Sequence, residues 1–345
     1  MAHQSNITVG GHTVPVWEFD STAQQIDNVV AALGAASTPQ EALAALGAAV
    51  RPNLLDNAYF AGGGTGWGVF PVNQRGQTSY TPVFNGRVMD RWAVEADADL
   101  KVTLEPDGIL LENTGFSDRQ LKQIIPSGIL STGNQYCISA LFDLISGSST
   151  VAIGQTESPY GSLGSVSLGT SGFASEVVEP QTDAEWKYIV YVYPGAKVKI
   201  KALKLEEGSS QTLAYQKSDG TWAMLPQNLD YHTELAKCQA YLWVPQQKNG
   251  HTVLGVGHAE NANIAWVTVV PPVSMRTGGT PTVKISDASA LNLRGSSIVT
   301  ATGVSVDQAT NGTPILLRVE GTFTPGEALD VFLANSASIE FSREL

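Results

Sequence analysis

The feature that most constrains this chain is a long series of short runs in which apolar and polar residues alternate. The segment DLKVTLEPDGILLENT, from Asp99 to Thr114, holds two such runs around a Pro-Asp-Gly turn. The runs QYCISALFDLISG, STVAIGQ, SLGSVSLGTSG, WKYIVYVYPG and KVKIKALKLEEG follow it. A period of two is typical of a strand with one buried face, and Gly, Pro and Ser between runs favour turns. Residues 52–207 are therefore predicted to form an antiparallel, jelly-roll-like β-sandwich. Its last two strands, Tyr188–Tyr193 and Val198–Leu205, are predicted to form a hairpin across Pro194-Gly195.

A second strand-rich block follows a connector and one helix. Residues 208–228 are rich in Gly, Ser, Gln and Pro, which is typical of a linker, and SDGTWAMLPQ within them favours a small hairpin. The run LDYHTELAKCQAYLWV predicts a helix. From Thr252 to Leu345 the alternation returns in about seven runs. Residues 229–345 are therefore predicted to form this helix plus a C-terminal β-sandwich.

The first 51 residues have a different pattern. ITVGGHTVPVWEF favours a hairpin around Gly10-Gly11. Two short helices are predicted next, the first with an apolar face and the second with a capping box at Thr38-Pro39-Gln40-Glu41. The face of the first helix consists of Ile26, Val29, Val30 and Leu33. Helices this short are marginal in water alone, so they need a packing partner.

Composition narrows the classes of partner. Charged residues make up only 15% of the 345 residues, and the net charge is −12. Because no stripe of Lys or Arg is present, nucleic acid is not an expected partner. We expect no membrane insertion, since no apolar run approaches the ~20 residues of a membrane span, and no secretion signal at the N-terminus. The two cysteines, Cys137 and Cys238, are predicted to be buried free thiols in a strand and a helix, which fits synthesis in a reducing cytosol.

The stretch from Asn53 to Tyr80, NLLDNAYFAGGGTGWGVFPVNQRGQTSY, allows three readings. It does not match a phosphate loop, because neither a helix nor a Lys-Ser/Thr pair follows the glycines. A sugar surface is possible, with Trp67 and Tyr80 as stacking rings and Asn73 and Arg75 as hydroxyl partners. The third reading is the opening of the first sandwich, in which glycines permit tight turns and Arg75 bonds to carbonyl groups. Trp92 is predicted to be a core residue.

The sequence lacks common catalytic and metal-binding motifs. It contains neither HExxH nor GxSxG. His251 and His258 flank a strand run and are interpreted as surface residues rather than as metal ligands. Asp97/Asp99 and Glu206/Glu207 would suit glycoside hydrolysis only if the fold placed the carboxylates ~5–9 Å apart across a cleft, and Asp97/Asp99 leave calcium possible. We therefore expect a protein that is not an enzyme and has no cofactor.

Several motifs together resemble those of one protein family. The order STAQQIDNVVAALGAASTPQEALAALGAAVRPNLLDNAYF, VNQRGQTSY and DRW, followed by HTELAKCQAYLW and the final SASIEFSREL, resembles tail-fibre and receptor-binding proteins of tailed phages, especially from prophages of Gram-positive gut bacteria. The chain departs from the family at Gln239-Ala240-Tyr241, where Gln-Arg-Tyr is common. The resemblance implies a virion tail protein, assembled in the host cytoplasm, that attaches through residues 1–51 to other tail or baseplate proteins and presents β-domains to host-surface glycan.

The resemblance and the apolar spacings together predict a homotrimer. Tyr231, Leu235, Cys238 and Leu242 follow one another at heptad-like spacing and could line a three-fold axis. The expected architecture is a mainly β homotrimeric fibre, with short N-terminal helices and two jelly-roll-like sandwiches joined by a linker and one helix. Two alternatives remain: a structural spacer or collar part without a ligand, and a glycan depolymerase.

Overall fold

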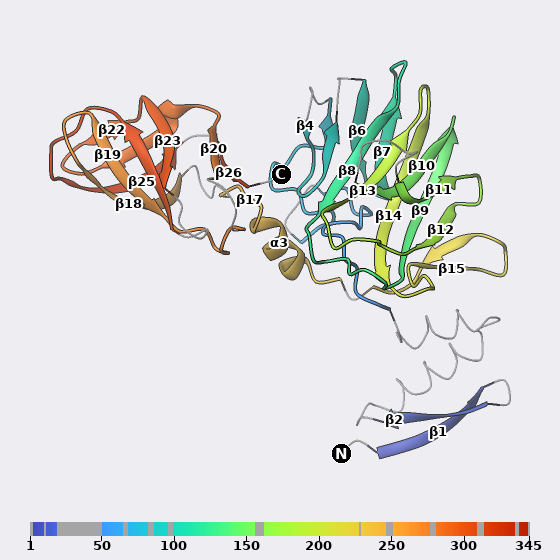
Figure 1. The fold of residues 1–345 in the computed structure, drawn as a ribbon. Coiled ribbons are helices and arrows are strands. Elements are labelled where there is room, and N and C mark those ends of the chain that lie inside the picture. The colour runs from blue at the N-terminus through green and yellow to red at the C-terminus, as the bar shows by residue number, and fades with distance from the viewer. Residues whose placement is uncertain are drawn as a thin grey trace.

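The structure is a computed structural model. It describes residues 3–9, 12–18, 50–64, 68–81, 86–95, 99–155, 162–227, 229–245, 251–276, 281–308, 314–334 and 338–343. The N-terminal hairpin predicted from the sequence is present, because β1 (His3–Val9) and β2 (His12–Glu18) pair antiparallel (Figure 1). The two short helices predicted after it lie outside the described residues. Ile26, Val29, Val30 and Leu33 lie there too.

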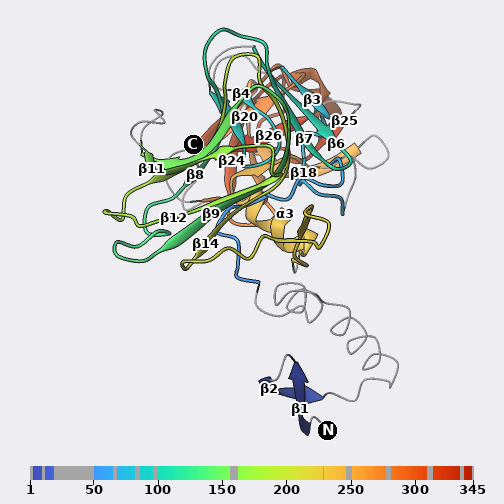
Figure 2. The same ribbon diagram turned by 90° about the vertical axis from the view of Figure 1, so that its right-hand side faces the viewer.

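The predicted first sandwich is present as two six-stranded antiparallel sheets (Figures 1 and 2). In spatial order, sheet I consists of β11 (Ser162–Leu168), β10 (Ser149–Gly154), β13 (Trp186–Val192), β8 (Arg119–Ile125), β5 (Ala93–Glu95) and β4 (Gly86–Arg87). Sheet II consists of β12 (Phe173–Val178), β9 (Tyr136–Ser146), β14 (Lys197–Glu207), β7 (Gly108–Asn113), β6 (Leu100–Glu105) and β3 (Ser79–Tyr80). We call residues 50–207 the first module.

The sequence alternation explains how these strands pack. In β8, buried and half-buried residues alternate without a break along RQLKQII, so every second side chain points into the sandwich. Both sheets contribute to one apolar core. At its centre the Trp92 ring contacts Phe60 and Tyr188 edge-on, with centroid distances of 5.6 and 6.4 Å. The prediction that Trp92 is a core residue is therefore confirmed.

The turn between β6 and β7 forms where the sequence predicts it. β6 ends at Glu105 and β7 begins at Gly108, so the two strands pair directly across Pro106-Asp107. Glycine is required at position 108 by close packing, since a Cβ there would lie 2.6 Å from the carbonyl oxygen of Ile200.

The hairpin predicted across Pro194-Gly195 is wrong. β13 pairs with β10 and β8 in sheet I, whereas β14 pairs with β9 and β7 in sheet II. The connection therefore crosses from one sheet to the other. Asn113 holds it there, because its backbone N–H donates to Ala196 and its carbonyl accepts from Gly195. Such crossings are usual in sandwiches with Greek-key connections, and alternation alone does not reveal them.

The connector after β14 folds back onto the outer face of sheet II. The small predicted hairpin is present as β15 (Ala214–Gln216) and β16 (Trp222–Met224). It closes a separate apolar cluster in which Trp222 stacks on Phe173 at a centroid distance of 4.3 Å. The connector is therefore packed against the first module rather than extended in solvent.

The second strand-rich block contains two further antiparallel sheets, at the left of Figure 1. The three-stranded sheet consists of β17 (Leu242–Trp243), β26 (Ile339–Ser342) and β20 (Thr282–Ile285). The seven-stranded sheet consists of β22 (Ile298–Thr300), β21 (Leu291–Arg294), β25 (Ala328–Ala334), β18 (His251–Ala259), β19 (Ile264–Val269), β24 (Ile315–Glu320) and β23 (Gly303–Gln308), with a short 3-10 helix η2 (Ala288–Ala290) before β21. One apolar core includes side chains from both sheets. We call residues 242–343 the second module.

The connector leads into helix α3 (Tyr231–Gln239), which precedes the second module. The helix is shorter than the sequence predicts, since it ends before Leu242 and Trp243, which instead pair with β26. Asp230 caps its first turn by accepting from the backbone N–H groups of His232 and Thr233. No helix in the described part of the chain is long and apolar enough to span a bilayer.

Candidate functional site

Residues from the NLLDN, NQRG, DRW and ELAKCQAYLW motifs meet where α3 contacts the first module. Asn57 is fully buried there. Its side-chain amide donates to the carbonyls of Val72 and Asp90 at 2.8 and 2.9 Å, and its side-chain oxygen accepts from the Val72 N–H at 2.6 Å. Its backbone N–H donates to Glu234 on α3 at 2.9 Å. The motif asparagine therefore ties three separate segments together.

Gln74 of the NQRG motif extends the same network into the second module. Its amide donates to the Asp90 carboxylate at 2.7 Å and to the Leu242 carbonyl at 2.6 Å. Its side-chain oxygen accepts from the backbone N–H of Val244 at 3.2 Å. Because Gln74 pairs with the backbone on both sides of Trp243, it acts like an extra strand edge for β17.

Arg91 of the DRW motif is the cationic residue of this contact. It has a φ of 72°, a left-handed conformation that is uncommon for a residue with a side chain. Its guanidinium donates to Asp56 at 3.0 Å and lies 3.4 Å from the ring centroid of Tyr241. Arg276 approaches the same ring at 5.6 Å. Cation–π contacts of this kind contribute roughly 0.5–2 kcal/mol each. We call Asn57, Gln74, Asp90, Arg91 and Tyr241 the junction network.

The apolar spacing assigned to a three-fold axis has a different role in the structure. Leu235 and Cys238 pack against Val72 of the first module, with Tyr231 beside them, and Leu242 is fully buried in β17. Leu235, Cys238 and Leu242 are buried within one chain, which corrects their assignment to a subunit interface, whereas Tyr231 is half-buried. The spacing shows that α3 has an apolar face, but the first module covers that face.

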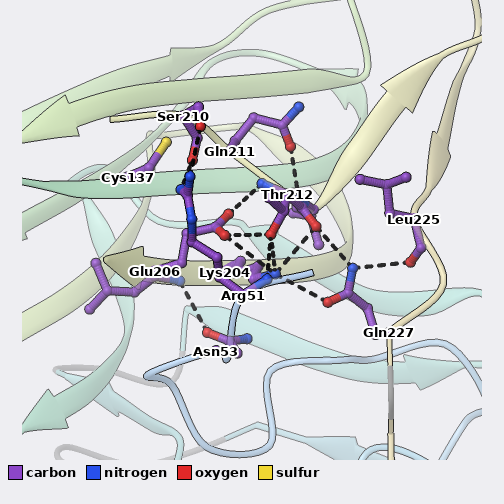
Figure 3. Close-up of polar contacts among 12 residues, drawn as sticks. Arg51, Asn53, Cys137, Lys204, Glu206, Ser210, Gln211, Thr212, Leu225 and Gln227 are labelled. Atoms are coloured by element: carbon purple, nitrogen blue, oxygen red, sulfur yellow. Dashed lines mark hydrogen bonds and ion pairs between the residues drawn. The ribbon is translucent and has the colours of Figure 1, made fainter. Parts of the chain in front are cut away.

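A second buried polar cluster fixes the connector (Figure 3). Lys204 and Glu206 lie on the outer face of β14, their side chains are 0% exposed, and their charged atoms are 3.6 Å apart. Glu206 accepts from the backbone N–H of Thr212 at 2.5 Å and from the Thr212 hydroxyl. Lys204 donates to the Thr212 hydroxyl at 2.8 Å and to Gln227 at 3.2 Å. The pair thus binds both ends of the connector.

Burial affects the pKa of Lys204 more strongly than the nearby carboxylate of Glu206 does. It lowers the pKa of Lys204 to about 8, and the carboxylate of Glu206 opposes the shift. Cys137 lies nearby, and burial raises the pKa of its thiol to about 11. Both Cys137 and Cys238 are buried free thiols, as the sequence predicts. Because the charged groups of Lys204 and Glu206 are closed off from solvent, this cluster is a structural clamp rather than a ligand site.

An open groove runs along α3, beside the junction network. Its first half is a cleft of about 330 Å³ between the start of the first module and the N-terminal turns of the helix. Polar side chains dominate its lining, and Asp230, Thr233 and Lys237 among them are exposed, whereas Arg51 is half-buried. Several of the lining side chains already have hydrogen bonds within the chain: Arg51 donates to the Ser210 carbonyl at 2.7 Å, and Tyr59 donates to Gln227 at 3.0 Å.

The second half of the groove is a more apolar cleft of about 300 Å³. Its lining includes Ile124, Pro126, Tyr241 and the 44% exposed Ile129. Lys237 lines both halves and pairs with Glu234 on the helix surface. We call the two clefts together the α3 groove. Volumes near 300 Å³ are at the lower end of the range for small-ligand sites.

The residues that the sequence offered as a sugar surface have internal contacts. Tyr80 is 5% exposed and its hydroxyl donates to Asn73 at 2.8 Å. Asn73 in turn donates to the carbonyls of Gly64 and Gln77. Arg75 donates to the Val88 carbonyl at 3.3 Å, as the structural reading of NQRG expects, and pairs with Glu340 of the second module at 3.3 Å. The three side chains therefore stabilise the fold and are not arranged as a stacking platform, whereas Trp67 lies outside the described residues.

The residues considered as carboxylate or metal sites do not come together in the part of the structure that is described. Asp99 pairs with Arg119 at 2.7 Å, and Asp97 lies outside the described residues. His258 is exposed on β18, whereas the side chain of His251 is not described. Within the described ranges, no group of three His, Cys, Asp or Glu side chains is placed to hold a metal ion.

Sequence reasoning missed the α3 groove because its walls come from positions far apart in the chain. Arg51, Ile124 and Asp230 share no motif and no spacing. The one available signal was the charged face of α3, since Asp230, Glu234, Lys237 and Tyr241 recur every three or four residues beside the apolar seam.

Comparisons with known proteins find solved structures of low sequence identity and low TM-score. No known family model matches, and no curated protein matches. TmCBM61, solved in complex with beta-1,4-galactotriose, is 15% identical with a TM-score of 0.24, over 34% of this chain and 88% of that one. A structure described as a CBM4 is 15% identical with a TM-score of 0.27, over 40% and 93%. A putative sugar binding protein from Bacteroides thetaiotaomicron is 14% identical with a TM-score of 0.31, over 46% and 100%. At these values neither a ligand nor a residue role is transferred.

Proposed function

We propose that this chain is a host-adsorption component of a phage tail, and that it binds cell-surface glycan in the α3 groove. The binding site is inferred from one observation: a polar cleft and a more apolar cleft are both lined by Lys237. The phage role rests on the motif resemblance, and the motif residues described in the structure form the contact between the two modules.

The chemistry of the groove suits a saccharide. A sugar ring presents hydroxyl groups at its edge and C–H groups on its faces. In the polar half, Arg51, Asp230 and Lys237 already bond to Ser210, Thr233 and Glu234. A carboxylate, a guanidinium and an ammonium each have more lone pairs or N–H groups than these bonds use, and the remaining ones suit sugar hydroxyl groups. The apolar half offers Ile129, Pro126 and Tyr241 for C–H faces. Lys237 on α3 lines both clefts, so one oligosaccharide can contact both halves.

The remaining parts of the proposal concern assembly. Residues 1–51 attach the chain to other tail or baseplate proteins, and the mature location is the virion tail. The chain acts as a homotrimer, because a single glycan site often binds near mM strength and linked sites raise avidity by roughly 10²–10⁴. The role is recognition without hydrolysis, and release of reducing sugars from host wall material would contradict it.

A glycan array on the full-length protein, followed by titration of the best ligand, tests the binding site. Lys237→Ala removes the side chain shared by both clefts, and its pair with Glu234 is a surface contact of small energetic weight. We expect its affinity for the ligand to fall at least fivefold. Lys217→Ala, at an exposed lysine of the connector hairpin, is the matched control and should bind like the wild type.

Two results would redirect the assignment. If Lys237→Ala binds like Lys217→Ala, the α3 groove is not the site. If Trp67→Ala abolishes binding while Lys237→Ala does not, the glycine-rich loop carries the sugar surface that the sequence suggests.

A structural spacer is the second candidate, and the junction network favours it. Asn57 bonds to α3, Gln74 bonds to β17, and Arg91 stacks on Tyr241 between them. These contacts hold the two modules together, which is what a rigid spacer requires. This reading predicts that the full-length protein binds no glycan on the array and none on host cells, while deletion of residues 1–51 still prevents incorporation into particles.

A further inference from the structure

The outer face of the seven-stranded sheet exposes large apolar side chains. Val253 and Val256 on β18 are 78% and 63% exposed, Val270 after β19 is 65% exposed, and Ile298 on β22 is 63% exposed. One face of an antiparallel sheet is normally solvated by polar residues. We call these four residues, together with Phe332 and Leu316, the β18 face.

The strand register places these residues side by side. Val253 pairs with Phe332 on β25, and Val256 pairs with Thr268 on β19, which pairs with Leu316 on β24. Val331 and Leu333 flank Phe332 on β25 and are buried, which sets Phe332 and its partner Val253 on the outer side. Ile298 pairs with Arg294 on β21, which is next to Asp330 on β25. The apolar side chains therefore lie on β22, β25, β18 and β24 and just after β19, and the Arg294–Asp330 pair lies between Ile298 and Val256.

The charges on the β18 face cancel locally. Arg294 pairs with Asp330 at 3.1 Å. On β24, Arg318 lies opposite Trp266 of β19 and pairs with Glu320. The whole chain, in contrast, has a net charge of −12. Two copies of so acidic a protein repel each other over most of their surfaces, and this repulsion is least where an apolar face carries paired charges.

We propose that the β18 face is a self-association surface, and that its occupant is a second copy of this chain. Contiguous exposed apolar area marks interaction sites in soluble proteins. The inference rests on the homo-oligomer part of the proposed function and gives it a location, since α3 cannot supply the interface: Leu235 and Cys238 are already covered by the first module. An apolar, locally neutral face suits an identical acidic copy better than a charged partner.

Mass photometry and light scattering on the full-length protein test this proposal. The wild type should appear at a multiple of its 36.5 kDa chain mass at micromolar concentration. Val253→Lys/Val256→Lys should shift it to the chain mass, with a dissociation constant raised at least 100-fold. Val177→Lys, at a 41% exposed valine on β12 of the first module, is the matched control and should keep the wild-type mass.

A milder variant guards against a folding defect. Val253→Thr/Val256→Thr keeps the branched shape that strands favour and removes the apolar surface. We expect it to raise the dissociation constant at least tenfold with an unchanged circular dichroism spectrum. A monomeric wild type at 10 µM overturns the proposal and leaves another virion protein as the occupant, and equal masses for the wild type and the threonine variant overturn it as well. Glycan binding by a monomeric variant is measured separately, so that failure of the α3 groove and failure of this interface are distinguishable.

Discussion

Loss of one charge from the buried Lys204–Glu206 pair is expected to destabilise the first module strongly. In Glu206→Gln, the Lys204 ammonium stays buried without a counter-charge, and an NH₂ group replaces one of the two oxygens that accept from Thr212. Removing one partner of a buried ion pair costs about 3–5 kcal/mol. That is a large share of the roughly 5–15 kcal/mol by which domains are stable.

The assay should report on the first module alone, because a chain with two modules need not unfold in one step. Hydrogen exchange of β14 amides, together with the melting transition of the first module, serves this purpose. At roughly 2–4 °C per kcal/mol for a module of this size, the expected decrease in Tm is about 6–20 °C. Faster exchange should extend to the connector, since Thr212 and Gln227 lose their anchor.

Two control variants on β14 make this result interpretable. Lys199→Met breaks the half-exposed pairs with Glu105 and Asp107, at 2.7 and 3.0 Å, and should cost less than about 1 kcal/mol. Lys204→Met/Glu206→Leu removes both charges and should recover most of the loss. The reasoning is refuted if Glu206→Gln is no less stable than Lys199→Met, or if the double variant is as unstable as the single one.

Three further predictions concern pH, the helix cap and the junction. Because burial lowers the pKa of Lys204 to about 8, the unfolded chain binds more protons than the folded one between pH 8 and about 10. The wild type should therefore gain stability relative to Lys204→Met/Glu206→Leu as the pH rises through that window, and a constant difference in Tm would count against the assignment. Asp230→Ala removes the acceptor for two N–H groups of α3 and should cost about 1 kcal/mol, measured as faster exchange in the helix, whereas Asp230→Asn should keep most of the cap. Asn57→Ala leaves buried backbone groups without their side-chain partner and should cost more than about 2 kcal/mol, so a Tm shift no larger than that of Asp230→Ala would contradict the role given to the junction network.

Strand identity was predictable because it depends on neighbouring residues. The alternation in β8 and the Pro-Asp-Gly turn before β7 are local patterns, and both appear in the structure as expected. Strand partners are decided by the whole sandwich. The short Pro194-Gly195 connection therefore looked like a hairpin, although β13 and β14 belong to different sheets.

The same distinction applies to the candidate sites. The spacing of Leu235 and Cys238 shows which side of α3 is apolar, but it does not show whether the same chain or another copy covers that side. The polar residues of NQRG could equally serve a sugar or a carbonyl group, and only the positions of Val88 and Glu340 distinguish the two. The α3 groove needed the fold itself, because Arg51 and Ile124 are brought to the helix by tertiary packing.

The second module meets the junction through two strands that lie side by side, since Leu242 of β17 pairs with Ser342 of β26. The chain therefore enters and leaves this module at one edge. Such an arrangement allows the residues between the two strands to be exchanged for another β-module through two joints that lie next to each other, with the first sandwich, the connector clamp and α3 left in place. Chimaeras joined within β17 and β26 would retain the contact of Gln74 with the Leu242 carbonyl.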